Sequence, residues 1–121
     1  MICLDTNVLI EILKNNRETL NKLQQLNVGF AISSISAMEL LYGARDKKEL
    51  IKLQAFLEKF KLIHLDQTSS ERGLELIAGF AKSHALDIPD ALIAATCLEH
   101  ALPLFTYNLK DFRFIPGLVI I

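Results

Sequence analysis

Short apolar runs alternate with longer segments of helical periodicity along this chain. The run Ile2-Cys3-Leu4 is too short for a stable helix and ends at the polar residues Asp5-Thr6-Asn7. A second apolar run, residues 8–13, follows at once. A short apolar run that stops at capping residues predicts a buried strand feeding a helix. Asp5 is therefore expected where the first strand ends and the first helix begins.

The same alternation continues to the end of the chain. Further strands are predicted at residues 29–32, 61–65, 104–106 and 118–121, with a turn at 108–112. Helices are predicted at 16–26, from Ser36 to a stop at Gly43, at 49–60, from a capping box at Thr68-x-x-Glu71 onward, and from Pro89 to 101. In the helix at 16–26, Leu20, Leu23 and Leu26 are expected to face inward. Strands that alternate with helices through short connections favour a single α/β domain, residues 1–121, with a parallel sheet covered by helices on both faces.

The charge balance and the two cysteines narrow the class of protein. Thirteen basic and fourteen acidic residues give a net charge of −1, so any binding to nucleic acid must come from a local patch. No apolar stretch approaches the roughly 20 residues that cross a bilayer. Met1 leads straight into the first strand, which leaves no room for a signal peptide. Cys3 and Cys97 fall in apolar segments, and two buried thiols suit a reducing cytoplasm.

Four acidic residues occupy equivalent places in this scheme. They are Asp5, Glu39, Asp90 and Asp111. Three of them follow a predicted strand directly or lie in the helix after it; for Asp90 we assume that its helix begins at the same edge. In a parallel sheet every strand-to-helix junction lies at one edge, which is where ligands bind. The four carboxylates are therefore expected to converge.

Each acid also has a purely structural explanation. Ser36-x-x-Glu39 matches a capping box, and Asp90 after Pro89 suits the positive end of a helix. Asn108-x-x-Asp111 resembles a cap, and Asp5 is a candidate cap as well. A cap contributes on the order of 1 kcal/mol. Two carboxylates about 4 Å apart repel by roughly 4 kcal/mol at an effective dielectric constant near 20, which exceeds that gain.

A cluster of this kind is tolerable only if protons or cations neutralise it. Hard oxygen ligands without a nearby His or Cys select Mg²⁺ or Mn²⁺ over Zn²⁺. None of the three histidines lies in an i, i+4 pair or near a cysteine. An all-carboxylate magnesium site most often serves phosphate chemistry. The set of four acids therefore indicates a metal-dependent reaction on a phosphate ester.

At this point the chain resembles a known family, the PIN-domain nucleases, and in particular the VapC-type toxins of bacterial and archaeal toxin–antitoxin pairs. The matching stretches are Asp5-Thr6-Asn7-Val8-Leu9-Ile10, Met38-Glu39-Leu40-Leu41-Tyr42-Gly43-Ala44, Asp90-Ala91-Leu92-Ile93-Ala94-Ala95 and Thr106-Tyr107-Asn108-Leu109-Lys110-Asp111-Phe112. They occur in family order over essentially the whole chain. The resemblance implies a PIN-like parallel-sheet fold and a Mg²⁺- or Mn²⁺-dependent endoribonuclease. It also implies a toxin that forms a homodimer and is blocked by a small antitoxin protein.

The resemblance also implies roles for the acids. Asp5 and Asp90 would be direct metal ligands, and Glu39 would hold the metal or its waters. The family places a fourth acid at the position of Asn108 or of Asp111, and here only Asp111 is charged. Many relatives carry an Arg where this chain has Tyr107, so one phosphate contact that the resemblance implies has no residue to make it.

The residues around these acids have two interpretations each. Thr6 and Thr106 are expected either to hydrogen-bond the metal ligands and orient them or to serve as ordinary strand-end caps. Asn108 is expected either to bind the metal through its amide oxygen or to fix its loop. Lys110 and Arg113 are candidates for contact with the RNA backbone, and the group around Arg45 is either a further contact or a solvated turn.

Two rival functions can be tested against the same residues. A non-catalytic PIN-like module that binds RNA or assembles a complex would not need all four acids. A haloacid-dehalogenase-like phosphatase also begins with a strand and an Asp, but its general acid would be a second Asp at the position of Asn7. A metal-activated water attacking in line would leave 5′-phosphate and 3′-hydroxyl ends.

Overall fold

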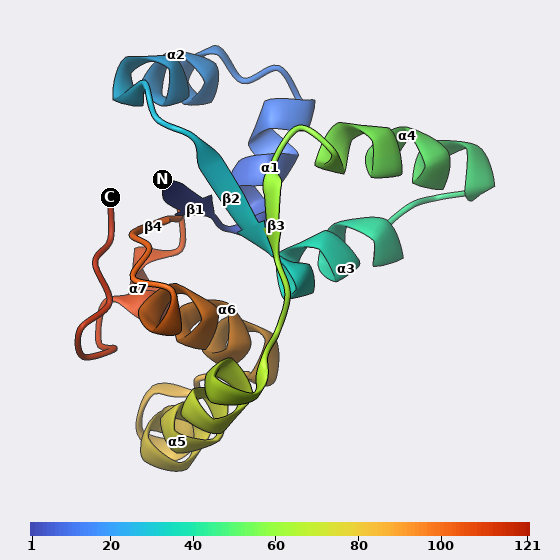
Figure 1. Ribbon diagram of the computed structural model, residues 1–121. Coiled ribbons are helices and arrows are strands. Elements are labelled where there is room, and N and C mark those ends of the chain that lie inside the picture. The colour runs from blue at the N-terminus through green and yellow to red at the C-terminus, as the bar shows by residue number, and fades with distance from the viewer.

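A parallel sheet lies at the centre of the computed structural model, which describes residues 1–121 (Figure 1). Its strands are β1 (Ile2–Leu4), β2 (Phe30–Ser33), β3 (Lys61–Ile63) and β4 (Leu104–Phe105), in the order β3-β2-β1-β4. Cys3 of β1 lies opposite Ala31 of β2 and Leu104 of β4. All three strand pairs are parallel, so every strand ends at the same edge of the sheet. The predicted fold class is confirmed.

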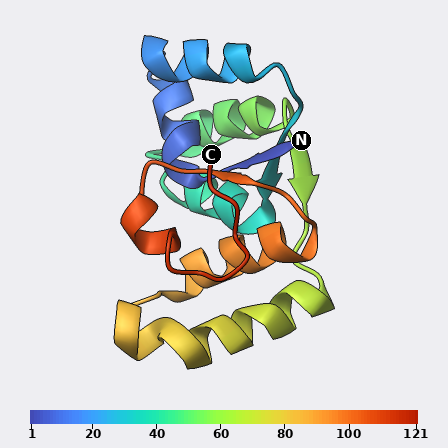
Figure 2. The ribbon, with the colours of Figure 1, turned by 90° about the vertical axis from the view of Figure 1, so that its left-hand side faces the viewer.

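Seven helices cover the two faces of the sheet. They are α1 (Thr6–Leu13), α2 (Arg17–Leu26), α3 (Ser34–Tyr42), α4 (Lys47–Leu57), α5 (Gln67–His84), α6 (Ile88–Glu99) and α7 (Leu109–Phe112). Figure 2 shows α1, α2 and α4 on one side of the sheet and α6 on the other, with α5 stacked outside α6. The core divides accordingly: Ile2, Leu4 and Phe105 pack in one cluster with α1, whereas Cys3 and Leu104 pack in the other with α6. Alternate residues of a strand point to opposite faces, which explains this division.

Two helices begin earlier than the predicted capping boxes. α3 starts at Ser34 because Ser33 Oγ accepts a hydrogen bond from the backbone N–H of Ser36 at 3.0 Å. α5 starts at Gln67, where Asp66 accepts from the N–H of Ser69 at 2.9 Å. In both cases a polar residue nearer the end of the preceding strand provides the cap. The predicted boxes at Ser36-x-x-Glu39 and Thr68-x-x-Glu71 are therefore wrong.

The other differences lie at the edges of elements. The predicted last strand is reduced to one bridge between Leu104 and Ile120, and residues 109–112 form a short helix where we expected a turn. α4 includes Lys47 and Lys48 and ends at Leu57, so it begins and stops earlier than predicted. Leu20 is 37% exposed, whereas Leu23 is buried, so the prediction that Leu20 faces inward is wrong. Because β4 has only two residues, the segment at residues 118–121 has too little strand beside it to form a fifth strand of the sheet.

Cys3 and Cys97 are both free and buried, as predicted. A hydrogen bond with Cys3 and burial raise the pKa of the Cys97 thiol, so it stays protonated. None of the helices combines the length and hydrophobicity needed to cross a bilayer.

Candidate active site

Asp5 is the most buried acid of the chain and lies where central strand β1 passes into α1. Its side chain is only 4% exposed. One carboxylate oxygen accepts from the backbone N–H of Thr6 at 2.8 Å, and the other accepts from Thr106 Oγ at 2.7 Å. Burial raises the pKa of Asp5, these two hydrogen bonds lower it, and the charges of Glu39 and Asp111 raise it further. The net direction is upward, so ionised Asp5 is under electrostatic stress despite both hydrogen bonds.

Glu39 reaches the same place from α3. Thr6 Oγ1 donates to Glu39 Oε1 at 2.8 Å, while the backbone N–H of the same Thr6 binds Asp5. One residue therefore bonds to both carboxylates and fixes their relative position. Glu39 itself is exposed and lies in the second turn of α3, so it is not the cap partner that the sequence suggested.

Asp90 lies in the first turn of α6, and its side chain is partly buried. Its backbone N–H donates to Asp87, the N-cap of the helix, at 2.9 Å. The pKa of Asp90 is raised to about 7, chiefly by burial and then by the charges of Asp87, Asp5, Asp111 and Glu39, in that order. α6 therefore begins at the same edge of the sheet as the other acids.

Asp111 is the fourth acid and lies exposed on α7. Its charge raises the pKa of both Asp5 and Asp90. The Asn108 side chain makes no capping hydrogen bond, so the Asn108-x-x-Asp111 cap is wrong. Instead the backbone N–H of Asn108 donates to Thr106 Oγ at 3.0 Å. The structure therefore brings together all four acids that the sequence singled out.

The four acids do not form a closed cage for an ion. No group of three or more His, Cys, Asp or Glu side chains is set closely enough to hold a metal ion in this arrangement. Burial, and not repulsion between the carboxylates, is the largest cause of the raised pKa of Asp5 and of Asp90. The donors are nevertheless all oxygens, which is the set that Mg²⁺ and Mn²⁺ prefer.

Cationic side chains flank the acids on two sides. Lys110 of α7 and Arg113, which directly follows α7, line a cavity of about 620 Å³ together with Lys82 of α5, and Asp111 also borders this cavity. Arg45 lines a second cavity, of about 750 Å³, with Thr6 and Glu39, but its guanidinium is paired with Glu49 at 2.7 Å. Lys110 and Arg113 therefore have an additional neighbour in Lys82, which the sequence did not suggest.

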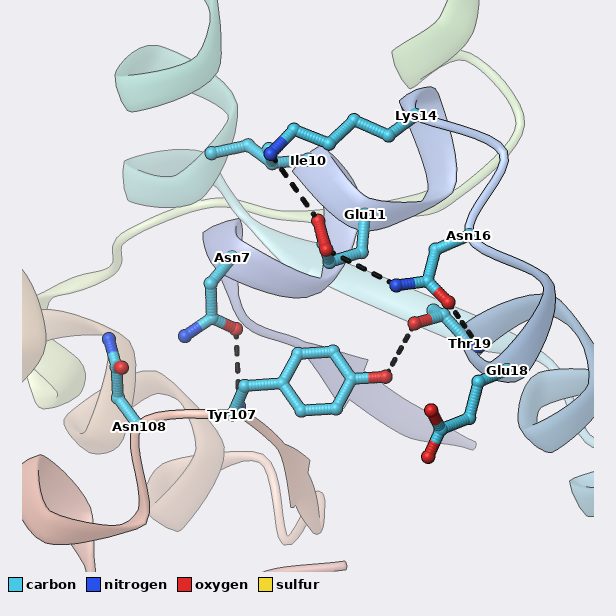
Figure 3. A pocket seen from close by; sticks show the side chains of 9 residues that line it. All are labelled: Asn7, Ile10, Glu11, Lys14, Asn16, Glu18, Thr19, Tyr107 and Asn108. Atoms are coloured by element: carbon cyan, nitrogen blue, oxygen red, sulfur yellow. Dashed lines mark hydrogen bonds and ion pairs between the residues drawn. The ribbon is translucent and has the colours of Figure 1, made fainter.

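The sequence reasoning missed two further polar residues of the site. Asp87 caps α6 and is the charged neighbour with the largest effect on Asp90; an Asp two residues before Pro89 is a recognisable helix start. Asn7 binds the loop after β4. Its Oδ1 accepts from the backbone N–H of Tyr107 at 3.3 Å (Figure 3). Its Nδ2 donates to Thr106 Oγ at 3.4 Å. No local sequence signal places residue 7 beside residues 106 and 107.

Comparison with known proteins identifies the fold family. The sequence pattern of the PIN domain matches residues 2–117. This chain belongs to the PIN-domain family. This PIN domain is 31% identical to the tRNA(fMet)-specific endonuclease VapC of Salmonella typhimurium, over 95% of its own length and 92% of that protein. It is 33% identical to Ribonuclease VapC1 of Methanocaldococcus jannaschii, over 93% of this PIN domain and 79% of that protein. The recognition of a VapC-type PIN domain from sequence is confirmed.

Solved structures show the same likeness in three dimensions. VapBC2 from Rickettsia felis, bound to a DNA fragment from its promoter, contains a chain with a TM-score of 0.84 and 31% identity, covering 100% of this PIN domain and 98% of that chain. A toxin–antitoxin complex from Klebsiella pneumoniae contains a chain with a TM-score of 0.82 and 35% identity, covering 98% of this PIN domain and 96% of that chain. The whole of the fold described above is therefore shared with toxin–antitoxin proteins.

Proposed function

We propose that this PIN domain is a metal-dependent endoribonuclease, the toxin of a type II toxin–antitoxin pair. The observation that carries the proposal is the convergence of Asp5, Glu39, Asp90 and Asp111 at one edge of the sheet, where the pKa of Asp90 is raised to about 7. Relatives named as ribonucleases and as a tRNA endonuclease, aligned over almost the full chain, support RNA as the substrate.

The four acids would hold Mg²⁺ or Mn²⁺. Asp5 and Asp90 are the buried or partly buried pair and are the proposed direct ligands. Glu39 and Asp111 are exposed, so their side chains have room to turn toward an ion or its waters. When bound, such an ion polarises the phosphate and lowers the pKa of a bound water. Asp90 would release its proton as a cation binds, because a positive charge lowers a carboxyl pKa.

The surrounding polar residues have positioning roles in this proposal. Thr106 and Thr6 hold both oxygens of Asp5, which leaves the carboxylate one orientation. Thr6 also holds Glu39. Asn108 binds Thr106 through its backbone, and its side-chain amide stays available as a weaker alternative to Asp111. Holding ligands in place before the reaction is what makes such a site effective.

The RNA backbone would follow the cationic cavity between α5 and α7. Lys110, Arg113 and Lys82 line it beside Asp111, which is the local patch that a chain of net charge −1 needs. Arg45 is a weaker candidate because it is already paired with Glu49. We further propose an antitoxin partner and a homodimer, on the strength of the solved toxin–antitoxin relatives. The two free thiols favour a cytoplasmic location.

Cleavage of RNA with and without Mn²⁺ tests the proposal. Wild type should cut single-stranded RNA only with the metal and leave 5′-phosphate and 3′-hydroxyl ends, and Asp5→Asn should lose the activity. Asp46→Asn is the matched control, because Asp46 also caps a helix, α4, but is not one of the four acids of the site. If wild type and Asp5→Asn behave alike and independently of metal, the non-catalytic module is favoured. A 2′,3′-cyclic phosphate product would contradict metal-activated water.

A further inference from the structure

A third cavity borders Tyr107 and Asn108, which directly follow Thr106 in the chain. Its volume is about 430 Å³, it is open to solvent, and it is lined by α1, the start of α2 and the loop after β4. Figure 3 shows the ring of Tyr107 in the middle of this cavity, with Asn108 and Glu18 on opposite sides of it. The proposed reaction does not use the side chains of Tyr107 and Glu18, and it uses the amide of Asn108 only as a weaker alternative to Asp111.

The Tyr107 ring is fixed in place from three directions. Its hydroxyl shares a hydrogen bond with Thr19 Oγ, and Thr19 is only 1% exposed. Its backbone N–H donates to Asn7, and its ring packs edge-on against Phe105 with centroids 5.3 Å apart. Even so, Tyr107 is 46% exposed. A rigid, half-exposed aromatic ring binds a flat partner without losing rotamer freedom.

The polar groups of the cavity suit a neutral planar ligand better than a phosphate. Lys14 is the only cation that lines it, and its ammonium is paired with Glu11 at 3.7 Å. The amide of Asn108 and the carboxylate of Glu18 have no partner within the protein, so they remain available to donate and accept hydrogen bonds at the two ends of the ring. A nucleobase has this combination of a π-face and hydrogen-bonding edges.

The position of the ring fixes which base it would meet. Tyr107 directly follows Thr106, whose hydroxyl binds Asp5. We propose that Tyr107 is the stacking platform for one base of single-stranded RNA, in the nucleotide next to the phosphate held at Asp5. This inference rests on the proposed ribonuclease function and extends it by naming the residue that holds the base.

Binding of a short RNA to an inactive protein tests the platform. The parent is Asp5→Asn, and the probes are eight-nucleotide single-stranded RNAs, labelled at the 5′ end, either intact or with one abasic position moved along the chain. Tyr107→Phe and Tyr107→Leu both lose the bond to Thr19, so their difference isolates the ring. We expect the Phe variant to bind about 5- to 150-fold more tightly than the Leu variant, the range that one base–aromatic stack produces. At one position along the RNA, an abasic site should weaken binding to the Phe variant and leave binding to the Leu variant unchanged.

Tyr42→Leu is the matched control, because Tyr42 is the only other tyrosine and is 94% exposed on α3. It should bind like the parent. Equal Kd values for the Phe and Leu variants, the same abasic profile in both, or no binding of RNA by the parent would each overturn the platform. Failure of the ribonuclease proposal looks different: wild type would then show no metal-dependent cleavage, while the ring-dependent binding would persist.

Discussion

Replacing Asp90 by Asn should make the protein more stable at pH 8 and remove a pH dependence that wild type has. The pKa of Asp90 is raised from 3.8 to about 7, chiefly by burial and then by Asp87 and the other acids. The folded protein therefore binds a proton at this site between about pH 4 and pH 7, where the unfolded chain does not. The contribution of Asp90 to the free energy of unfolding is fully present below about pH 4. It is lost as the pH rises to about 7, and it does not change above that value.

The size of the effect follows from the same shift. A rise from 3.8 to about 7, at 1.36 kcal/mol for each pKa unit, sets an upper bound of about 4 kcal/mol on the cost of ionising Asp90. Asp90 is only partly buried, and solvent screening reduces such a figure by about half, to about 2 kcal/mol. Asn has nearly the shape of Asp and no charge to desolvate, so the variant should avoid most of this cost.

Urea unfolding at pH 4 and pH 8, with EDTA present, measures the effect. Between these pH values the free energy of unfolding should fall by about 2 kcal/mol more in wild type than in Asp90→Asn. Glu18→Gln is the matched control, because Glu18 also lies in the first turn of a helix but is exposed, and it should change stability by about 0.5 kcal/mol at most. Parallel pH profiles for wild type and Asp90→Asn would show that the pKa of Asp90 is not raised, and would refute this reasoning from its burial.

Three further predictions concern the metal, the acid's hydrogen bond and the helix packing. At pH 8, Mg²⁺ at ten times its Kd should raise the free energy of unfolding of wild type by about 1.4 kcal/mol and leave Asp5→Asn unchanged; equal stabilisation of both would place the ion elsewhere. Thr106→Val removes the 2.7 Å bond to Asp5, so it should lower kcat by about tenfold and stability by about 1 kcal/mol, with recovery in Thr106→Ser. Gly73→Ala would place a Cβ 2.8 Å from Leu92 Cδ2 where α5 packs on α6, so the Leu92 side chain must shift, and this variant should be about 1 kcal/mol less stable than Gly79→Ala in thermal unfolding. Gly79→Ala on the same helix meets no atom within 4 Å and should be neutral or slightly stabilising, which tests whether packing is the cause.

The local sequence pattern was sufficient for the elements and for the list of acids. Ile2-Cys3-Leu4 followed by Asp5 predicts a strand and a helix start because burial and capping depend on neighbouring residues. The helix starts at Ser34 and Gln67 were missed for the same local reason, since two polar residues within three positions compete to be the cap. The predicted last strand, residues 118–121, forms only one bridge because its pairing depends on how long β4 is, not on its own apolar pattern.

The sequence by itself singled out the candidate side chains: four acids, each placed just after a strand or within the first two turns of a helix. Only the tertiary structure decided how they meet. It placed the start of α6 at the sheet edge, gave Asp90 a pKa of about 7 chiefly through burial, and joined Thr19 to Tyr107 across 88 residues. The physical reason is that desolvation and hydrogen bonds between distant residues depend on the path of the whole chain, whereas periodicity and capping are set within a few residues.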